Sequence, residues 1–443
     1  MLLLLACVDP AGGDAAQGDH GHDTASETVV LEFPADRWSE GGLLSGTLVA
    51  GSVDDHFGYN GVSPGPTFRA TVGDDVSISL VNDLDDGTSV HWHGMEVPNA
   101  MDGVSFVTDP VSPGGSFEYA FTANRPGTFW YHPHVDVSRQ VDLGLYGAFV
   151  VTDPADPVPD RDLVLVFDAA DEYEGEVEAI AGGHDDGELH DAPDPSQTTW
   201  RVNGLSQPTL ALEPGERVLA RVVNASNAAY LSLNWPGARL VGGDQGRLSA
   251  PASVEEVLVA PGQRVEIEVV DGRGYVEVTT SMWTPAGGAS YGAAEVLLYL
   301  DGSDTEGEPL GFTFDGALPS PDPAYADLVY TFQGGAHDEA WLIDGESWPD
   351  VTPRTVDLGA ELIVEARNIS ATSHPFHLHG HRLELLSVNG VAPSAARWVD
   401  TVDVPIRATV RMKLSADNAG SWALHCHLLG HEDHGMMTIL EVE

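Results

Sequence analysis

Short alternating segments dominate the chain from residue 29 onward. Apolar and polar residues alternate at 76–81, at 217–223 and at 264–270, and turns rich in Gly, Pro and Asp-Gly separate these segments. A period of two residues is typical of strands with one buried face, and no long segment shows the 3.6-residue period of an amphipathic helix. The pattern therefore predicts an all-β protein built from sandwiches.

A weak internal repeat occurs three times along the chain. Each copy opens with a turn dipeptide and reaches an asparagine at the end of its alternating strand, and histidines follow in the first and third copies only. The three pairs are Asn60-Gly61 with Asn82, Asn203-Gly204 with Asn224, and Asp344-Gly345 with Asn368. Pro/Asp-rich and acidic links lie near 152–159 and 301–309. We therefore expect three related domains, at 29–155, 156–303 and 304–443, the middle one without a metal site.

Composition and charge limit the possible classes of protein. The chain has 443 residues, 42% of them hydrophobic, which suits about three domains with real cores. No apolar run reaches the ~18 residues of a membrane span. With 19 Lys and Arg against 69 Asp and Glu, the formal net charge is −50, which excludes nucleic acid as a partner. The acidic surface keeps the protein soluble and could attract cations.

The first 28 residues differ from the rest. Leu4-Leu5-Ala6-Cys7 resembles a bacterial lipobox, and residues 8–27 are rich in Gly, Asp, Ala and Ser, as in a flexible tether. We expect residues 1–28 to be a lipoprotein-like signal and tether that exports the protein to the periplasm or cell envelope, with membrane attachment through lipidated Cys7. The alternative is a truncated secretory signal with a chance cysteine. The second cysteine, Cys426, lies at the other end of the chain, so no structural disulfide is expected.

Histidines carry the candidate chemistry. Among 18 histidines, six His-x-His pairs occur, and four of them fall in strand-like contexts. These four are His91-Trp92-His93, His132-Pro133-His134, His377-Leu378-His379 and His425-Cys426-His427. Residues i and i+2 of a strand point to the same face, so the pairs deliver eight imidazoles. Eight are too many for one ordinary metal ion and predict a cluster of ions such as copper.

Cys426 predicts a second site on the other side of its strand. Its thiolate points away from His425 and His427, and His431 and Met436 follow five and ten residues later. His374 precedes the third histidine pair by three residues. Two His, one Cys and a weak axial Met form the trigonal blue-copper ligand set. The His425-Cys426-His427 tripeptide would therefore join two metal sites through a few bonds.

Four motifs between residues 30 and 443, HWHG, HPH, HPFHLH and HCHLLGHEDHGM, resemble those of the three-domain multicopper oxidases, a family that includes laccases, bilirubin oxidases and bacterial copper-efflux oxidases. The resemblance implies three cupredoxin-like Greek-key β-sandwich domains and four coppers per chain. The implied ligands are His374, Cys426, His431 and Met436 for type 1 copper, His91 and His377 for type 2 copper, and His93, His132, His134, His379, His425 and His427 for the type 3 pair.

The resemblance also implies an activity. Family members remove electrons one at a time at type 1 copper and reduce O₂ to two waters with four electrons at the other three coppers. Asp102 and Glu432 match acidic positions of bacterial relatives and are the expected catalytic proton donors. Asp400 lies in residues 397–401, which resemble a structural segment near the copper cluster of the family. His184 and His190 lie in an acidic, Gly-bearing loop and are expected to bind no catalytic copper.

Four functions remain open at this point. They are a laccase-like oxidase of phenols or aromatic amines, a metallo-oxidase of Cu(I), Fe(II) or Mn(II) in copper tolerance, a non-catalytic copper-binding envelope protein, and a copper nitrite reductase. The complete histidine set disfavours the last two. Only seven Met residues exist and none lies between Met282 and Met412, which disfavours a cuprous oxidase. We therefore expect a monomeric laccase-like enzyme with O₂ and a small-molecule phenol, amine or metal-ion reductant as partners.

Overall fold

The computed structural model describes residues 29–54, 56–171, 198–254, 257–269, 275–283, 290–302, 308–334 and 340–443. Regular structure in these residues is almost entirely β, which confirms the predicted fold class. The described helical segments are short: η1 (Asn99–Met101), α1 (Val137–Asp142) and α3 (Leu429–Asp433). None of them has the length and apolar character needed to cross a bilayer. Cys7, His184 and His190 lie outside the described residues.

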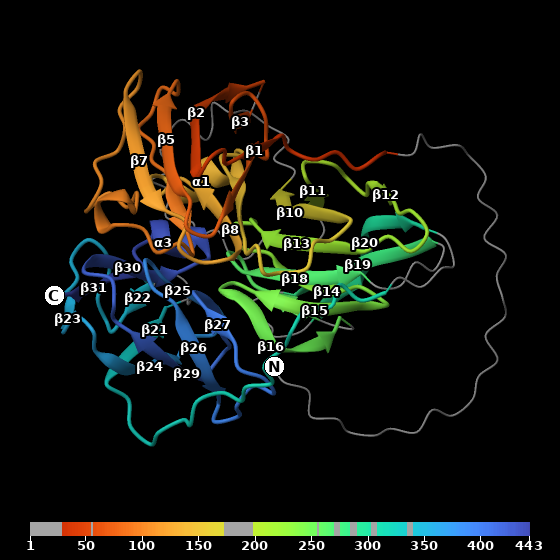
Figure 1. Cartoon of the computed structure of the whole chain (residues 1–443). Helices are drawn as coiled ribbons and strands as arrows, with labels where there is room; N and C mark the ends of the chain where they lie inside the picture. Colours follow the sequence, from red (N-terminus) through yellow and green to blue (C-terminus); the bar gives the residue numbers. More distant parts are fainter. Residues whose placement is uncertain are drawn as a thin grey trace.

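Six sheets form three two-sheet sandwiches that pack against one another (Figure 1). The first sandwich, drawn in red to orange, combines the sheets β3-β2-β5-β7 and β1-β4-β9-β8-β6. Its strands are β1 (Asp36–Trp38), β2 (Leu43–Val53), β3 (His56–Tyr59), β4 (Thr67–Thr71), β5 (Asp75–Asn82), β6 (His91–His93), β7 (Ser116–Thr122), β8 (Gly127–His132) and β9 (Gly147–Thr152).

The second sandwich combines the sheets β11-β10-β13-β18-β15-β16 and β12-β20-β19-β14-β17. Its strands are β10 (Arg161–Asp171), β11 (Thr198–Val202), β12 (Thr209–Ala211), β13 (Val218–Asn224), β14 (Tyr230–Asn234), β15 (Ala238–Gly243), β16 (Gly246–Ser253), β17 (Val257–Val259), β18 (Arg264–Val269), β19 (Tyr275–Trp283) and β20 (Ser290–Asp301).

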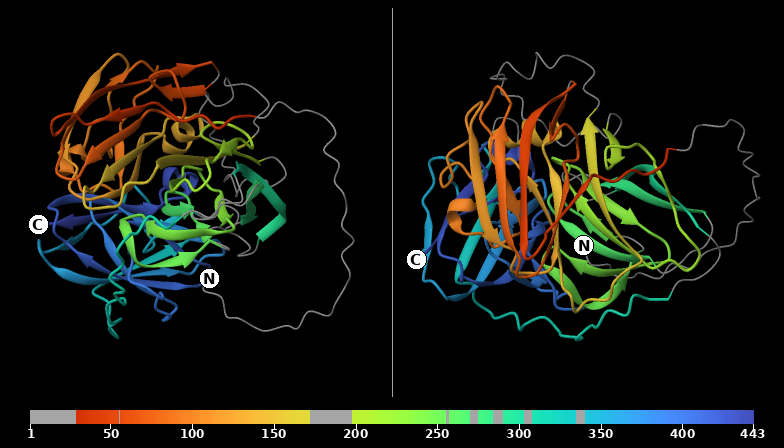
Figure 2. Two further views of the ribbon diagram at one scale, coloured as in Figure 1. Left: turned by 45° about the vertical axis from the view of Figure 1, so that its right-hand side comes forward. Right: turned by 45° about the horizontal axis from the view of Figure 1, so that its top comes forward.

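The third sandwich, in blue, combines the sheets β22-β21-β24-β29-β26-β27 and β23-β31-β30-β25-β28. Its strands are β21 (Leu328–Gln333), β22 (Leu342–Ile343), β23 (Arg354–Val356), β24 (Glu361–Asn368), β25 (His374–Leu378), β26 (Leu383–Val388), β27 (Trp398–Val399), β28 (Thr401–Val404), β29 (Thr409–Ser415), β30 (Gly420–Cys426) and β31 (Met437–Val442). The two views in Figure 2 show that it lies against both other sandwiches.

The sequence repeat has the same structural role in all three sandwiches. Asn82, Asn224 and Asn368 each end a strand, and each side-chain amide donates to two backbone carbonyls at 2.7–2.9 Å. The amide oxygen accepts from the backbone N–H two residues later, at 2.9–3.1 Å. These bonds satisfy backbone groups at the turn that follows the strand. The domain boundaries at 155/156 and 303/304 stay predictions.

Two strands of the middle sandwich are buried on both faces. β13 and β18 alternate in sequence, which is typical of one solvated face, yet every residue of both strands is buried. The reason is that both strands contact β8 of the first sandwich. Their polar face, which includes Arg221, Arg264 and Glu266, therefore lies at the interface between the sandwiches rather than in water.

Candidate copper centres

Three side chains of the third sandwich converge on one point. Cys426 ends β30, His374 begins β25 and His431 lies on α3. The Cys426 Sγ atom lies 3.4 Å from Nδ1 of His374 and 3.6 Å from Nδ1 of His431, and the two Nδ1 atoms are 3.3 Å apart. Met436 is buried beside them, and its backbone carbonyl accepts a hydrogen bond from Cys426 N at 3.1 Å. The structure thus brings together three of the donors expected for type 1 copper and places the backbone of the fourth, Met436, beside Cys426.

Ser370 orients one of these donors. The Ser370 hydroxyl lies 2.7 Å from Nε2 of His374 and itself donates to Asn368 and Thr372, so it accepts the Nε2 proton. The lone pair of His374 is therefore left on Nδ1, which faces the Cys426 sulfur. Burial lowers the pKa of His374 to about 3, so the imidazole is neutral and competent to bind a metal.

His431 differs from the other two donors in exposure. It is half-buried, whereas His374 and Cys426 are fully buried. Its ring stacks on Trp341, with ring centroids 3.6 Å apart and an interplanar angle of 20°. Burial also lowers the pKa of His431 well below its ordinary value. His431 is thus the donor of this centre with the best access to solvent.

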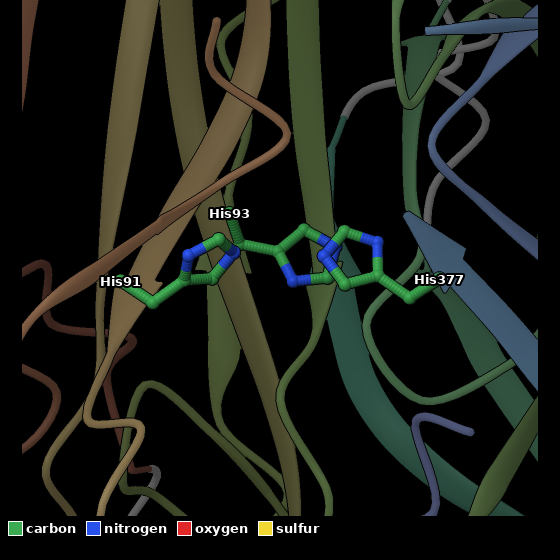
Figure 3. Close-up of side chains that lie close together, drawn as sticks. All are labelled: His91, His93 and His377. Atoms are coloured by element: carbon green, nitrogen blue, oxygen red, sulfur yellow. The ribbon is translucent and has the colours of Figure 1, made fainter. Parts of the chain in front are cut away.

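Eight histidines from the first and third sandwiches meet in a second, buried cluster. Their ring nitrogens form three groups with atoms within 4.8 Å of one another. The groups are His91, His93 and His377; His93, His132 and His427; and His134, His379 and His425. Figure 3 shows the first group, in which the rings of His93 and His377 stack with centroids 3.8 Å apart. The structure therefore gathers all eight imidazoles that the strand spacing predicted would share one place.

Oxygen atoms hold one ring nitrogen of seven of the eight imidazoles. For six rings the held atom is Nδ1, and for His93 it is Nε2. Four Nδ1 atoms face backbone carbonyls: His91 faces Asp102, His132 faces Pro133, His377 faces Asp400 and His425 faces Cys426. Two face carboxylates: His379 faces Asp102, and His134 faces Glu432. The other nitrogen is left with a lone pair that faces the cluster, as in metal-binding histidines.

The free nitrogens fit metal ions and little else. Nε2 of His91, His132, His134 and His377 and Nδ1 of His93 are buried and have no hydrogen-bond partner among the described residues. Burial lowers the pKa of five rings of the cluster well below the ordinary value and that of His134 to about 4, so these six rings are neutral. The five are His93, His132, His377, His379 and His427. Several lone pairs aimed at one dry space are costly unless a cation binds them. Imidazole is a favoured ligand of copper, so the donor set fits a copper cluster.

Nε2 of His379 and Nε2 of His425 lie only 3.1 Å apart. Burial lowers the pKa of His425 too, but the Glu432 carboxylate, 2.9 Å from its Nδ1 atom, outweighs this effect and raises the pKa above its ordinary value. The carboxylate therefore favours a proton on Nδ1 and leaves Nε2 for a ligand at the cluster.

Both predicted catalytic carboxylates are buried at this cluster. Asp102 Oδ2 lies 2.8 Å from Nδ1 of His379, and its Oδ1 atom lies 3.4 Å from Nδ1 of His91 and has no hydrogen-bond partner among the described residues. Glu432 lies 2.9 Å from Nδ1 of His425 and 3.3 Å from Nδ1 of His134. The two groups thus contact candidate ligands from opposite sandwiches.

Sequence reasoning missed several residues around the two centres. Ser370, Trp341 and Gln245 carried no motif, and Arg264 looked like one polar position of an alternating strand. Asp400, expected near the cluster, proves to contact His93 directly, with Oδ1 3.0 Å from Nε2. Their roles depend on contacts between segments far apart in the chain, which spacing alone does not encode.

The geometry defines a class of protein, and comparison with known proteins agrees with it. Residues 46–156 and residues 321–443 each match a family model described as multicopper oxidase. The chain belongs to the multicopper oxidases: it is a copper-dependent oxidoreductase that uses O₂, and its sandwiches are cupredoxin-like.

Individual relatives cover nearly the whole chain. "Multicopper oxidase MmcO" of Mycobacterium tuberculosis is 30% identical, with 97% of this chain and 89% of that protein covered. "Laccase-1" of Botryotinia fuckeliana is 28% identical, with 97% and 86% covered. The structure of the multicopper oxidase of Campylobacter jejuni, described as a metallo-oxidase, superposes with a TM-score of 0.76 at 25% identity and covers 94% of this chain and 98% of its own.

Proposed function

We propose that the protein is a laccase-like multicopper oxidase, which oxidises phenols or aromatic amines and passes the electrons to O₂. The observation that carries the proposal is the pair of donor sets joined by one tripeptide. Cys426 faces His374 and His431, whereas its neighbours His425 and His427 face the eight-histidine cluster. In this proposal the copper ligands are those that the family resemblance implied, with type 1 copper in the third sandwich.

When bound, copper supplies one-electron oxidation at the type 1 site and four-electron reduction of O₂ at the cluster. The chain supplies the connection between the sites. His425 and His427 are the direct neighbours of Cys426, and Nδ1 of His425 donates to the carbonyl of Cys426 at 3.0 Å. The two donor sets are therefore connected through covalent bonds, with one hydrogen bond as a shorter route. All three residues of the connection are buried.

In this proposal the chain also passes protons to the cluster. Asp102 and Glu432 are the proposed proton donors, because both are buried carboxylates within reach of the cluster. Burial raises the pKa of Glu432, but His134 and His425 outweigh this effect and lower it to about 2, so Glu432 would take up a proton before it passes one on. Asp102 Oδ1, which has no hydrogen-bond partner among the described residues, is the atom best placed to hand a proton to oxygen bound nearby. The carboxylates also orient the imidazoles that they contact, which is a separate, positioning effect.

The surroundings of His431 favour an aromatic electron donor. His431 is half-buried and lies face to face with Trp341, so a flat ring that approaches it meets an aromatic wall rather than a set of ion ligands. In the described residues, the His431 ring contacts Cys426, His374 and Trp341. The stretch without methionine between Met282 and Met412 points the same way.

A metallo-oxidase is the second candidate function. Its support is the net charge of −50, which would attract cations, and the Campylobacter jejuni neighbour described as a metallo-oxidase. A non-catalytic copper-binding envelope protein is a weaker third candidate, because every expected donor is present. Export to the periplasm or cell envelope and lipidation of Cys7 are also proposed. Their support is the Leu4-Leu5-Ala6-Cys7 tetrad alone, since residues 1–28 lie outside the described residues.

One experiment separates these functions. Oxygen consumption of the copper-loaded protein is measured at steady state with 2,6-dimethoxyphenol, an aromatic diamine, Cu(I), Fe(II) and Mn(II). A kcat/KM for the aromatic donors above that for every metal ion supports the proposal, and the reverse order assigns a metallo-oxidase. Copper loading without oxygen consumption would assign the non-catalytic role. Cys426→Ser is the control: it should lose the intense visible absorption and the activity with all donors.

A further inference from the structure

All the proposed ligands of the copper cluster belong to the first and third sandwiches. One side chain of the middle sandwich nevertheless contacts a carboxylate beside the cluster. Arg264, at the start of β18, is buried, and its side chain has no exposed surface. The adjacent strand β8 of the first sandwich covers it, because Arg264 Nε donates to the carbonyl of Thr128 at 3.1 Å. A fully buried arginine is rare unless its charge is paired, so its partners show what it is for.

All five N–H donors of Arg264 are satisfied. Nη1 donates to Asp400 Oδ1 at 2.8 Å and to the carbonyl of Gly262 at 2.9 Å. Nη2 donates to Asp400 Oδ2 and, at 2.9 Å, to the carbonyl of Asp244. The two bonds to Asp400 form a bidentate fork, the most directional pairing of a guanidinium with a carboxylate. Arg264 therefore fixes the plane of the Asp400 carboxylate and not only its charge.

Asp400 in turn holds His93. The carboxylate is fully buried, and its Oδ1 atom lies 3.0 Å from Nε2 of His93. Gln245 donates to the other oxygen from the middle sandwich. Because Arg264 donates to both oxygens of Asp400, the carboxylate is held with Oδ1 toward His93, which favours the His93 proton on Nε2 and the lone pair on Nδ1. Nδ1 of His93 is the atom that faces the cluster without a partner among the described residues.

His93 needs this support more than its neighbours do. Of the seven tethered imidazoles, it is the one held through Nε2, whereas the other six are held through Nδ1. A neutral imidazole can place its proton on either nitrogen, so the outer partner decides which atom is free for a metal. Thr401 Oγ1 also lies 3.0 Å from Nε2 of His93, and this hydroxyl donates to Asp400 Oδ1 at 2.8 Å. Loss of the Asp400 acceptor would therefore remove one partner of His93 and release the other.

We infer that Arg264 is a positioning residue of the oxidase, which fixes His93 as an Nδ1 ligand through Asp400 and so couples the middle sandwich to the copper cluster. This inference rests on the proposed role of His93 as a ligand of the type 3 pair. The path from Arg264 to His93 crosses all three sandwiches: Arg264 lies in the second, Asp400 in the third and His93 in the first.

The chain offers a matched control for a merely structural effect. Arg221 is also a buried arginine of the middle sandwich that contacts β8, with Nη1 3.1 Å from Thr128 Oγ1. It forms a fork with Asp162, at 2.7 and 2.8 Å, and an ion pair with Glu266. Neither of these carboxylates contacts an imidazole in the described structure. Arg221→Lys therefore disturbs the same interface without disturbing a candidate ligand.

The test compares Arg264→Lys with Arg221→Lys in the full chain loaded with copper. Lysine keeps the cation but cannot form the fork. For Arg264→Lys we expect the type 3 pair to lose its near-ultraviolet absorption and the cluster to bind copper about 10–100-fold more weakly in competition with a chelator. The visible band of Cys426 should persist, because that site lies in the third sandwich. Arg221→Lys should keep four coppers and both absorption bands.

Equal copper affinity and type 3 absorption in the two variants would overturn the inference and leave the oxidase assignment intact. A wild-type protein without a type 3 signature would instead overturn the proposed function. If Arg264→Lys does not fold, the Gln245→Met variant tests the inference instead. It removes one donor to Asp400 and keeps the fork, so a smaller loss of the same type 3 signature is expected, and an unchanged cluster contradicts the inference.

Discussion

Asp102 Oδ2 lies 2.8 Å from Nδ1 of His379, although 277 residues separate the two along the chain. Asp102→Asn keeps an oxygen that can accept this hydrogen bond and removes the group that can give up a proton. We therefore expect full copper content and normal anaerobic reduction of the type 1 site, with turnover under O₂ reduced by about 10²–10⁴-fold. Stopped-flow measurement of reduction and of reoxidation by O₂ separates the two steps.

The control for this prediction is Asp403→Asn. Asp403 is a carboxylate of the third sandwich that accepts a hydrogen bond from Tyr230 at 2.9 Å, rather than holding a cluster imidazole. The Asp403→Asn variant should leave reoxidation by O₂ unchanged. Slow reduction with normal reoxidation in Asp102→Asn would place its defect on the substrate side and reject the proton relay.

Ser370 and Ser373 form a pair for testing the orientation of His374. Both are buried, but only the Ser370 hydroxyl contacts Nε2 of His374, while the Ser373 hydroxyl has no hydrogen-bond partner among the described residues. Ser370→Ala leaves the Nε2 proton without an acceptor, so we expect type 1 copper affinity to fall by about 10–100-fold. Ser373→Ala should leave the affinity unchanged. Copper titration followed by visible absorption measures both variants, and an equal affinity would show that Ser370 does not orient the ring.

Met436→Leu tests the weak axial ligand. Loss of a weak donor disfavours the oxidised, more highly charged copper, so the type 1 reduction potential should rise while the visible band persists. Redox titration of the visible band gives the potential. Met437, the adjacent residue, is also buried, and Met437→Leu is the matched control that should leave the potential unchanged. Equal potentials in both variants would show that Met436 is not axial.

Gly94 lies where the Arg264–Asp400 fork passes over the backbone. A Cβ atom at this position would lie 2.6 Å from Asp400 Oδ2 and closer still to Arg264 Nη2, and φ is +83°. Gly61 has a similar φ of +80° but nothing within 4 Å of its Cβ position. The change Gly61→Ala should cost about 1–2 kcal/mol of unfolding free energy from the left-handed backbone. Gly94→Ala should cost a further ~1–3 kcal/mol from overpacking.

Denaturant unfolding of the copper-free protein measures this difference, because copper binding would otherwise add its own stabilisation. Similar losses for the two alanine variants would mean that the fork yields to the added methyl group. The type 3 absorption of copper-loaded Gly94→Ala offers a second reading, since a displaced Asp400 should also disturb His93.

Sequence was a good guide wherever the signal was local. Alternation predicted the strands, and the repeated asparagines marked three equivalent turns. The i, i+2 spacing of the histidine pairs predicted the shared cluster, and the position of Cys426 between His425 and His427 predicted two sites on opposite sides of one strand. The family, the copper cofactor and the oxidase class are confirmed by comparison, while the role of each ligand stays a prediction.

The remaining features depend on how the sandwiches dock. Arg264 contacts Asp400 across 136 residues, and nothing in the alternating sequence of β18 distinguishes its polar side from a solvated face. Ser370 acts through its contact with His374, and Trp341 through ring contacts with His431 and His374; neither belongs to a repeated pattern. Such residues become visible only when the strands that carry their partners are placed in space.

The two donor sets differ in how much of the chain must be folded before they exist. The proposed type 1 donors, His374, Cys426, His431 and Met436, all belong to the third sandwich, so we expect the blue colour to depend mainly on the folding of that sandwich. The eight-histidine cluster is shared between the first and third sandwiches, and Arg264 of the middle sandwich contacts Asp400 beside it. We therefore expect the type 3 signature to report the assembled chain, and a partly assembled protein to be blue without reducing oxygen.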